Sequence, residues 1–151
     1  MSDMVVQRSL LIKAAPGTIL AQIEDLHKWR DWSPWEGLDP DLKREYGGPE
    51  SGEGATYSWS GNRKAGAGTM RIASVTADGV DVNVDFTKPF PSQSVSSFRL
   101  EPQGGDTLVT WTMTSPRNLM MKVMSIFIKF DKMLGKDIEK GLAGLASVTK
   151  S

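Results

Sequence analysis

Cysteine is absent from this 151-residue chain, and histidine occurs only once, at His27. The absence of cysteine excludes disulfides, thiolate metal ligands and thiol nucleophiles, and it leaves the redox compartment undetermined. A Ser-His-Asp triad could use no base other than His27. One histidine, with no carboxylate cluster at ligand spacing, gives no recognisable metal site. We therefore expect neither a metal nor another cofactor.

An excess of charge of one sign is also missing, because 18 Lys and Arg residues balance 18 Asp and Glu residues. Nothing in this balance favours a nucleic-acid partner, and we expect none. No apolar run approaches the roughly 20 residues that a membrane span needs. The segment 1–11 lacks the basic, apolar and small-residue pattern of a signal peptide. We therefore expect a cytoplasmic protein without a membrane span.

The composition that remains is that of an ordinary globular protein, with 39% hydrophobic and 24% charged residues. A chain of this length fits one domain and buries roughly 68–70% of its unfolded surface, which is enough for a hydrophobic core. No linker, internal repeat or low-complexity stretch divides the sequence. We therefore expect a single domain over residues 1–151.

The middle of the chain shows the period-two alternation that is typical of half-buried strands. In the clearest case, Val80, Val82, Val84 and Phe86 alternate with polar residues. Similar patterns predict further strands over residues 4–13, 55–60, 66–72, 98–100 and 109–113. Short turn segments such as 104–105 separate them, as in an antiparallel meander.

Two short helices are predicted before these strands. Pro16 suits the first turn of a helix, and apolar residues then recur at helical spacing up to Leu26. Further along, Ser33, Pro34 and Glu36 form a capping-box pattern, with a hydroxyl cap, a proline at the first helical position and a carboxylate three residues on. The second short helix is therefore expected to begin at Ser33.

A long amphipathic helix is predicted at the C-terminal end of the chain. Ser115 can cap it, and Pro116 stands where a first helical residue should. Its apolar stripe consists of Met120, Val123, Phe127, Phe130, Leu134, Ile138, Leu142, Leu145 and Val148. The apolar face of the predicted sheet must be buried, and only this helix is long enough to cover it. The fold class is therefore predicted to be α+β.

Local motifs along nearly the whole chain carry a resemblance to a known superfamily. They are Asp25 with Trp29, Trp32-Ser33-Pro34-Trp35, Leu38-Asp39-Pro40, Tyr46-Gly47-Gly48-Pro49, Gly52-Glu53-Gly54-Ala55, Tyr57 to Asn62, Gly66 to Met70, Thr107 to Trp111 and Gly135 to Leu142. With the order of the elements, they resemble the START-like (SRPBCC) superfamily, and within it the bacterial polyketide cyclase/dehydrase-like branch.

This resemblance implies the helix-grip fold that is shared with birch-pollen-allergen-like proteins. A curved antiparallel sheet of about seven strands would wrap around the long C-terminal helix, with two short helices after the first strand. It also implies a cavity between sheet and helix for a hydrophobic small molecule. Fold alone does not choose a function, because the superfamily includes carriers, cyclases, receptors and regulatory modules.

The expected cavity would be lined by inward residues of the strands and the helix and by residues at its rim. Aromatic and apolar walls are typical of small-molecule pockets, and methionine adapts to varied apolar shapes. The predicted lining residues are Trp32, Trp35, Tyr57, Trp59, Met70, Val82, Val84, Phe86, Phe90, Phe98, Trp111, Met113, Met124 and Phe127. Each of them can equally be a core residue with no ligand contact.

Candidate catalytic side chains are few, and no residue is assigned a catalytic role. The polar residues to test are Tyr57, Arg71, Asn62 and Glu45. Each also has a structural interpretation. Tyr57 can be a core residue with a solvated hydroxyl, and Arg71 can be an outward strand residue. Asn62 can be a turn residue, and Glu45 can be a solvated residue at the sheet edge. His27 is interpreted as a solvated helix residue.

The tryptophan patch and the long helix each have two interpretations. Trp29, Trp32 and Trp35 either clamp the short helices onto the sheet or form one rim of the pocket, opposite Phe90. On the long helix, apolar residues off the main stripe indicate a homodimer contact or cover by the N-terminal loops, with a transient membrane-surface contact as the alternative. They are Met121, Ile126 and Ile128, with Met133 beside the lysines.

Three functions are consistent with these observations. The first is binding or transport of a hydrophobic small molecule, such as a lipid or a polyketide-like compound. The second is a polyketide cyclase, aromatase or dehydratase that acts by positioning its substrate. The third is a protein-interaction or stress-regulatory module. A buried polar group with a perturbed pKa would favour the enzyme, and a uniformly apolar cavity would favour the carrier.

Overall fold

The computed structural model describes residues 4–33, 41–62, 66–88, 92–115 and 124–149. In chain order, the elements are β1 (Met4–Ile12), α1 (Pro16–Ile23), the 3-10 helix η1 (Leu26–Asp31), β2 (Lys43–Gly47), β3 (Thr56–Ser60), β4 (Ala67–Thr76), β5 (Gly79–Lys88), β6 (Ser92–Gln103), β7 (Asp106–Ser115) and α2 (Met124–Val148).

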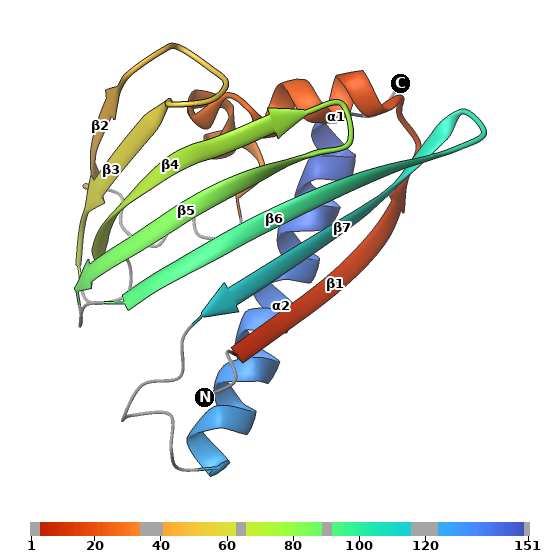
Figure 1. Cartoon of the computed structure of the whole chain (residues 1–151). Coiled ribbons are helices and arrows are strands. Elements are labelled where there is room, and N and C mark those ends of the chain that lie inside the picture. Colours follow the sequence, from red (N-terminus) through yellow and green to blue (C-terminus); the bar gives the residue numbers. More distant parts are fainter. Residues whose placement is uncertain (1–3, 34–40, 63–65, 89–91, 116–123, 150–151) are drawn as a thin grey trace.

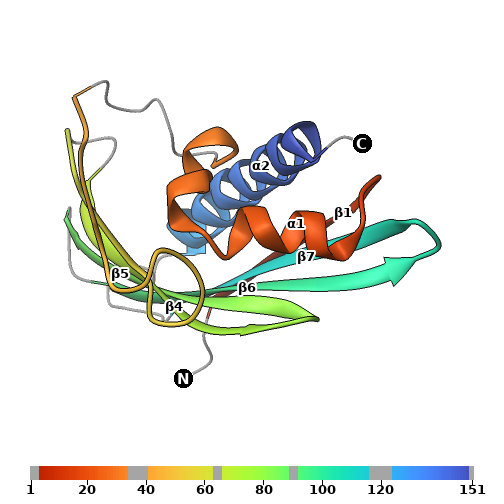
Figure 2. The same cartoon turned by 90° about the horizontal axis from the view of Figure 1, so that it is seen from above.

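The strands form one antiparallel sheet in the order β1-β7-β6-β5-β4-β3-β2 (Figure 1). Consecutive strands from β2 to β7 are neighbours. The strand β1 lies at the edge of the sheet beside β7, with Val6 opposite Met113. The sheet is curved, and α1, η1 and α2 all lie on its concave side (Figure 2). The expected α+β helix-grip architecture is therefore confirmed.

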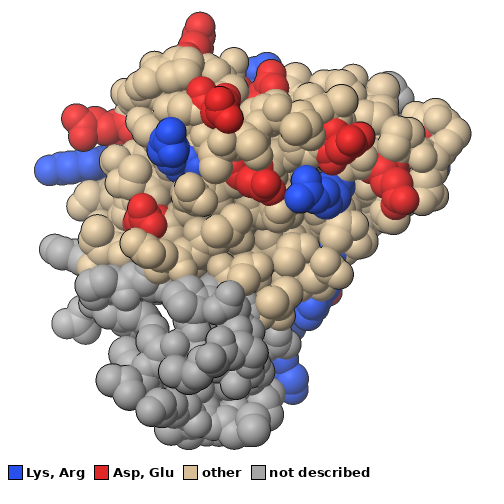
Figure 3. Space-filling view, in the orientation of Figure 1, with Lys and Arg blue, Asp and Glu red and all other residues tan. Residues whose placement is uncertain are grey.

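Alternation along each strand assigns one set of side chains to the concave face and the other to solvent. On β5, Val80 and Val82 are fully buried and Val84 is 5% exposed, while Asp85 is exposed on the opposite face. The outer face is polar, and cross-strand pairs such as Ser9 with Thr110 bond through their hydroxyls at 2.8 Å. In the coloured part of Figure 3, positive and negative side chains are interspersed on this face.

The helices do not cover the concave face evenly. The sheet contacts of α2 are mainly with β1, and the sheet contacts of α1 are with β6 and β5. The inward side of α2 is apolar, and Ile138, Leu142 and Leu145 are at most 1% exposed. Most helix contacts with the sheet are therefore with β1, β5, β6 and β7, and at β2 the His27 ring of η1 stacks on Tyr46.

Two tryptophans of η1 and its C-cap join the short helices to the sheet. The indole N–H of Trp29 donates to the Ile23 carbonyl at 2.8 Å, and that of Trp32 donates to the Gln22 carbonyl at 3.2 Å. These are carbonyls of the last turn of α1, which have no partner within the helix. Both rings also pack edge-to-face on Phe98, with centroid distances of 5.7 and 5.9 Å.

A short helix, η1, lies between α1 and the segment where the sequence predicted a second helix. α1 ends at Ile23, and Asp25 then caps η1 by accepting a hydrogen bond from the His27 backbone N–H at 3.0 Å. The capping-box pattern at Ser33 falls partly on residues 34–40, which lie outside the described residues. The strand β2 was not predicted, because Lys43–Gly47 contains a single apolar side chain at the edge of the sheet. Among the described residues, no helix is both long and apolar enough to span a membrane.

Gly144 provides a stability test of the contact between α2 and the C-cap of η1. A Cβ atom at Gly144 would lie 2.8 Å from the Trp32 carbonyl oxygen and 3.3 Å from its Cα, and backbone atoms cannot move aside cheaply. We expect Gly144→Ala to lower the free energy of unfolding by roughly 1–3 kcal/mol. Gly17→Ala is the matched control, because nothing lies within 4 Å of its added Cβ in α1. It should be neutral or stabilising by up to about 1 kcal/mol. Urea denaturation measures both, and equal effects would contradict the packing argument.

Candidate ligand-binding site

Over β2 to β6, the concave face carries two parallel rows of side chains. Side chains directly opposite each other on neighbouring strands share a face of the sheet. The first row crosses five strands and consists of Tyr46, Tyr57, Met70, Val84 and Ser94. The second row crosses β2 to β5 and consists of Arg44, Trp59, Gly68 and Phe86.

The rings of these rows form a continuous aromatic series, which runs from His27 through Tyr46, Tyr57 and Trp59 to Phe86. Successive centroids are 4.0, 5.1, 6.0 and 5.6 Å apart. The four rings from β2, β3 and β5 are only partly buried, although they pack against the core. The four partly buried rings therefore lie on the same side of the sheet that buries Val82 and Val84 completely or nearly so.

Gly68 determines how Trp59 lies in this series. It stands directly opposite Trp59 on β4. A Cβ atom at Gly68 would lie 2.6 and 2.9 Å from two atoms of the Trp59 ring and 2.5 Å from the Asp85 carbonyl oxygen. The indole therefore lies directly over the glycine, a contact that no other residue type at this position allows.

Two buried serines extend the site beyond the apolar residues. Ser94 is 6% exposed and Ser96 is 1% exposed, and Ser96 lies between Val82 on β5 and Met113 on β7. Buried hydroxyls on an apolar face can orient a ligand that carries a polar group. The sequence analysis missed them, although continuing the alternation of Phe98 and Leu100 backwards would have placed both serines on the inner face.

His27 lies at the β2 end of the aromatic series, and its exposed side chain contacts two neighbours. Its Nδ1 is 2.9 Å from Asp25 Oδ1, and its ring stacks on Tyr46 with an angle of 19° between the planes. The side chain of Asp25 is 19% exposed and that of His27 is 47% exposed. His27 is thus an exposed helix residue, as expected, and a carboxylate and an aromatic ring also hold its imidazole.

The predicted lining residues fall into three groups. The rings of Trp32, Phe98 and Trp111 pack on one another, with Phe98 and Trp111 fully buried, so they form core rather than an open wall. The inner rows and their buried neighbours contain Tyr57, Trp59, Met70, Val82, Val84, Phe86 and Met113. Trp35 and Phe90 lie outside the described residues, as do the side chains of Met124 and Phe127.

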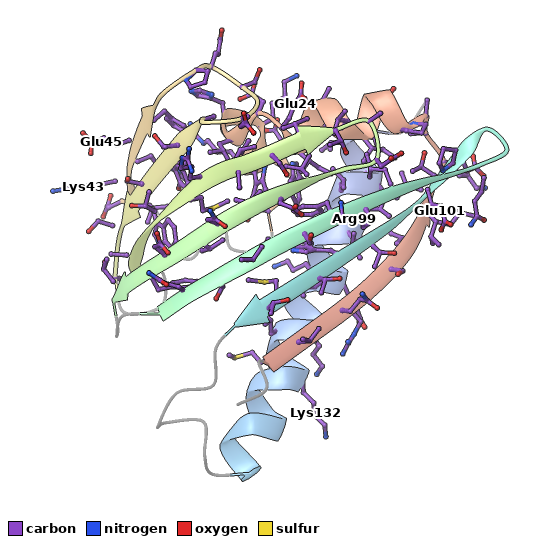
Figure 4. The ribbon with its side chains drawn as sticks, in the orientation of Figure 1. Glu24, Lys43, Glu45, Arg99, Glu101 and Lys132 are labelled. Atoms are coloured by element: carbon purple, nitrogen blue, oxygen red, sulfur yellow. The ribbon has the colours of Figure 1, made fainter. Side chains whose placement is uncertain are left out.

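The four polar candidates do not come together at one place. Arg71 and Glu45 are exposed on the outer face, and Figure 4 shows Glu45 pointing away from β2 together with Lys43. Asn62 is exposed after β3. Only Tyr57 lies on the concave face, in the first row. The positions of the other three match their structural alternatives.

Most of the apolar helix residues expected at a partner contact lie outside the described residues. Met121 and the side chains of Ile126 and Ile128 lie outside the described residues, so the homodimer and membrane-surface interpretations stay predictions. Met133 is described and is 58% exposed. Within the described ranges, no group of three His, Asp or Glu residues could hold a metal ion.

Comparison with known proteins assigns a family to this geometry. A family model described as "Polyketide cyclase / dehydrase and lipid transport" matches residues 4–149. The sequence has no match among curated proteins.

Solved structures of the same fold share little sequence with this chain. A protein from Nitrosospira multiformis is 18% identical with a TM-score of 0.68, and 98% of this chain and 97% of that chain are covered. The Aha1 dimer from Colwellia psychrerythraea is 16% identical with a TM-score of 0.65, and the match covers 97% of this chain and 96% of that chain. Ara h 8.0201 is 11% identical with a TM-score of 0.63, and the match covers 96% of this chain and 99% of that chain. At these identities, the likeness establishes the fold.

The contact between Gly68 and Trp59 predicts a local change in the site. We expect Gly68→Ala to displace the Trp59 indole, because the added methyl group would occupy the position of the ring. The shift of the Trp59 indole N–H resonance, assigned with Trp59→Phe, measures this displacement. Gly105→Ala is the control, since nothing lies within 4 Å of its added Cβ. An unchanged Trp59 resonance in folded Gly68→Ala would contradict the expected displacement.

Proposed function

Because the chain belongs to the polyketide cyclase/dehydrase and lipid transport family, we propose that it binds an elongated hydrophobic small molecule on the concave face of its sheet. The observation that carries this proposal is the partly buried aromatic series on the inner face, beside apolar residues that are almost completely buried. Partly buried aromatic rings on a concave surface offer apolar contacts to a small molecule.

The rows also suggest the dimensions of the ligand. From Tyr46 on β2 to Ser94 on β6, the first row crosses four strand spacings, or about 19 Å along the sheet. A fatty acyl chain or a molecule of several fused rings has this scale. The hydroxyls of Ser94 and Ser96 favour a ligand with a hydrogen-bonding group at one end, and the aromatic series favours a flat or extended apolar body.

The rival functions predict different sites. A protein-interaction module needs no accessible apolar rows, so a ligand bound at these rows would count against it. Conversion of the ligand requires a group that moves protons, and binding alone would not establish it. The cytoplasmic location and the transient membrane-surface contact stay separate predictions.

Native mass spectrometry of the purified protein, followed by denaturing extraction, tests the proposal directly. A stoichiometric apolar passenger would support it and identify the chemical class of the ligand. The proposal would be rejected if no passenger is found and no thermal shift appears across a panel of fatty acids and aromatic polyketides. The same spectra report the oligomeric state. We propose a homodimer through Met121, Ile126 and Ile128, and the dimer named for the Colwellia neighbour is consistent with one.

Truncation of the aromatic series should weaken binding without unfolding the protein. We expect Tyr57→Ala and Trp59→Ala each to raise the Kd of a bound fatty acid or aromatic ligand about tenfold, which corresponds to about 1.4 kcal/mol of lost contact. Leu11→Ala is the control, because Leu11 is an apolar side chain that is 47% exposed on the outer face. Isothermal titration calorimetry measures the three affinities. An equal loss in Leu11→Ala would indicate a general effect on stability, and no loss in either aromatic variant would place the ligand elsewhere.

A further inference from the structure

We propose that Asp25 and His27 form a base that removes a proton from the carbon beside a carbonyl group of a ligand held on the aromatic series. This inference rests on the proposed binding function and adds a chemical step to it. It assigns His27 Nε2 as the atom that takes the proton and Asp25 as the residue that positions the imidazole. The substrate class is a conjugated or aryl ketone.

The hydrogen bond between the two side chains determines which ring nitrogen is basic. Asp25 Oδ1 lies 2.9 Å from His27 Nδ1 and also accepts the His27 backbone N–H at 3.0 Å. An ionised carboxylate only accepts hydrogen bonds, so Nδ1 carries the proton in neutral His27. The lone pair that can accept a proton is therefore on Nε2. Among the described residues, Nε2 has no hydrogen-bond partner.

His27 lies at the end of the aromatic series on which the ligand is proposed to bind. The imidazole stacks on Tyr46 at a centroid distance of 4.0 Å, and Tyr46 lies 5.1 Å from Tyr57 in the first row. A flat molecule on Tyr57 and Trp59 would therefore reach the imidazole by extending along the same series. About half of the His27 side chain is exposed, so the ring is accessible.

The chemical step needs no co-reactant. Nε2 takes the proton from the carbon adjacent to the carbonyl, and the electron pair of the broken C–H bond forms the enolate, whose negative charge lies on oxygen. The imidazolium that forms is stabilised by the carboxylate of Asp25. Returning the proton to carbon or to oxygen regenerates His27 and gives the starting ketone or its enol. A general base of this kind contributes roughly a hundredfold or more to rate.

A purely structural role for this pair makes a different prediction. Asp25 would then serve only as the N-cap of η1, and His27 would only support the Tyr46 ring. Under that alternative, substitutions would change stability and ligand affinity together. A catalytic role predicts that proton transfer is lost while ligand affinity is kept.

The test uses the full chain and 2-acetylnaphthalene, an aryl methyl ketone. Quenching of tryptophan fluorescence measures binding, and mass spectrometry measures deuterium uptake at its methyl group in D₂O. We expect the unsubstituted protein to bind the ketone and to accelerate exchange, and His27→Gln to lose this acceleration by roughly a hundredfold at an affinity within about twofold. Asp25→Asn should lose exchange in the same way, and Asp25→Glu should restore part of it. Lys28→Gln, an exposed neighbour on η1, should match the unsubstituted protein.

The outcomes separate this inference from the function on which it rests. If both the unsubstituted protein and His27→Gln bind the ketone and exchange its methyl protons at equal rates, the proposed role of His27 as a base is overturned. The proposed ligand binding would still stand. No binding of the ketone by the unsubstituted protein, together with no passenger in the native mass spectrum, would overturn both. If His27→Gln is destabilised in circular dichroism, His27→Asn and Asp25→Asn provide the same comparison.

Discussion

The packing of Trp29 and Trp32 between the short helices and the sheet is the interaction on which the rest of the fold depends. Each indole uses its N–H to satisfy a carbonyl at the end of α1 and its ring to contact Phe98 and Trp111. Burial of a tryptophan side chain of about 200 Å² contributes about 5 kcal/mol at 25 cal/mol per Å². This pair of residues therefore fixes α1, η1 and the sheet relative to each other. The helix α2 packs closely against the backbone of Trp32 at Gly144.

This arrangement divides the concave face into two regions with different physical properties. Where the tryptophans and α2 meet β6, β7 and β1, side chains such as Phe98, Trp111 and Ile138 are completely buried. Over β2 to β5, the aromatic rings pack against the core but stay partly accessible. The first region supplies stability, so the second can expose apolar surface without loss of the fold. Separation of this kind allows a ligand site to vary while the scaffold is kept.

Much of the fold was predictable because strand alternation and helix spacing are local signals. The strict pattern of Val80 to Phe86 identified β5, and resemblance supplied the topology. The site was less predictable, since the same alternation describes a core residue and a ligand contact alike. Phe98 and Tyr57 have similar patterns, but only cross-strand register and cover by η1 make one buried and the other accessible. The contact of His27 with Tyr46 joins residues from a short helix and an edge strand, which no spacing rule connects.

The pairing of the first strand with the last has a consequence for how the chain reaches this structure. Side-chain hydrogen bonds between β1 and β7 join residues 101 and 105 positions apart, as in Ser9 with Thr110 and Gln7 with Thr112. Such non-local pairing forms slowly, because a long loop must close before the contacts stabilise it. During synthesis, β1 emerges first and has no partner until β7 has followed it. The exposed apolar side chains of Val5 and Leu11 are then part of an unpaired strand, and such a strand favours aggregation of a growing chain.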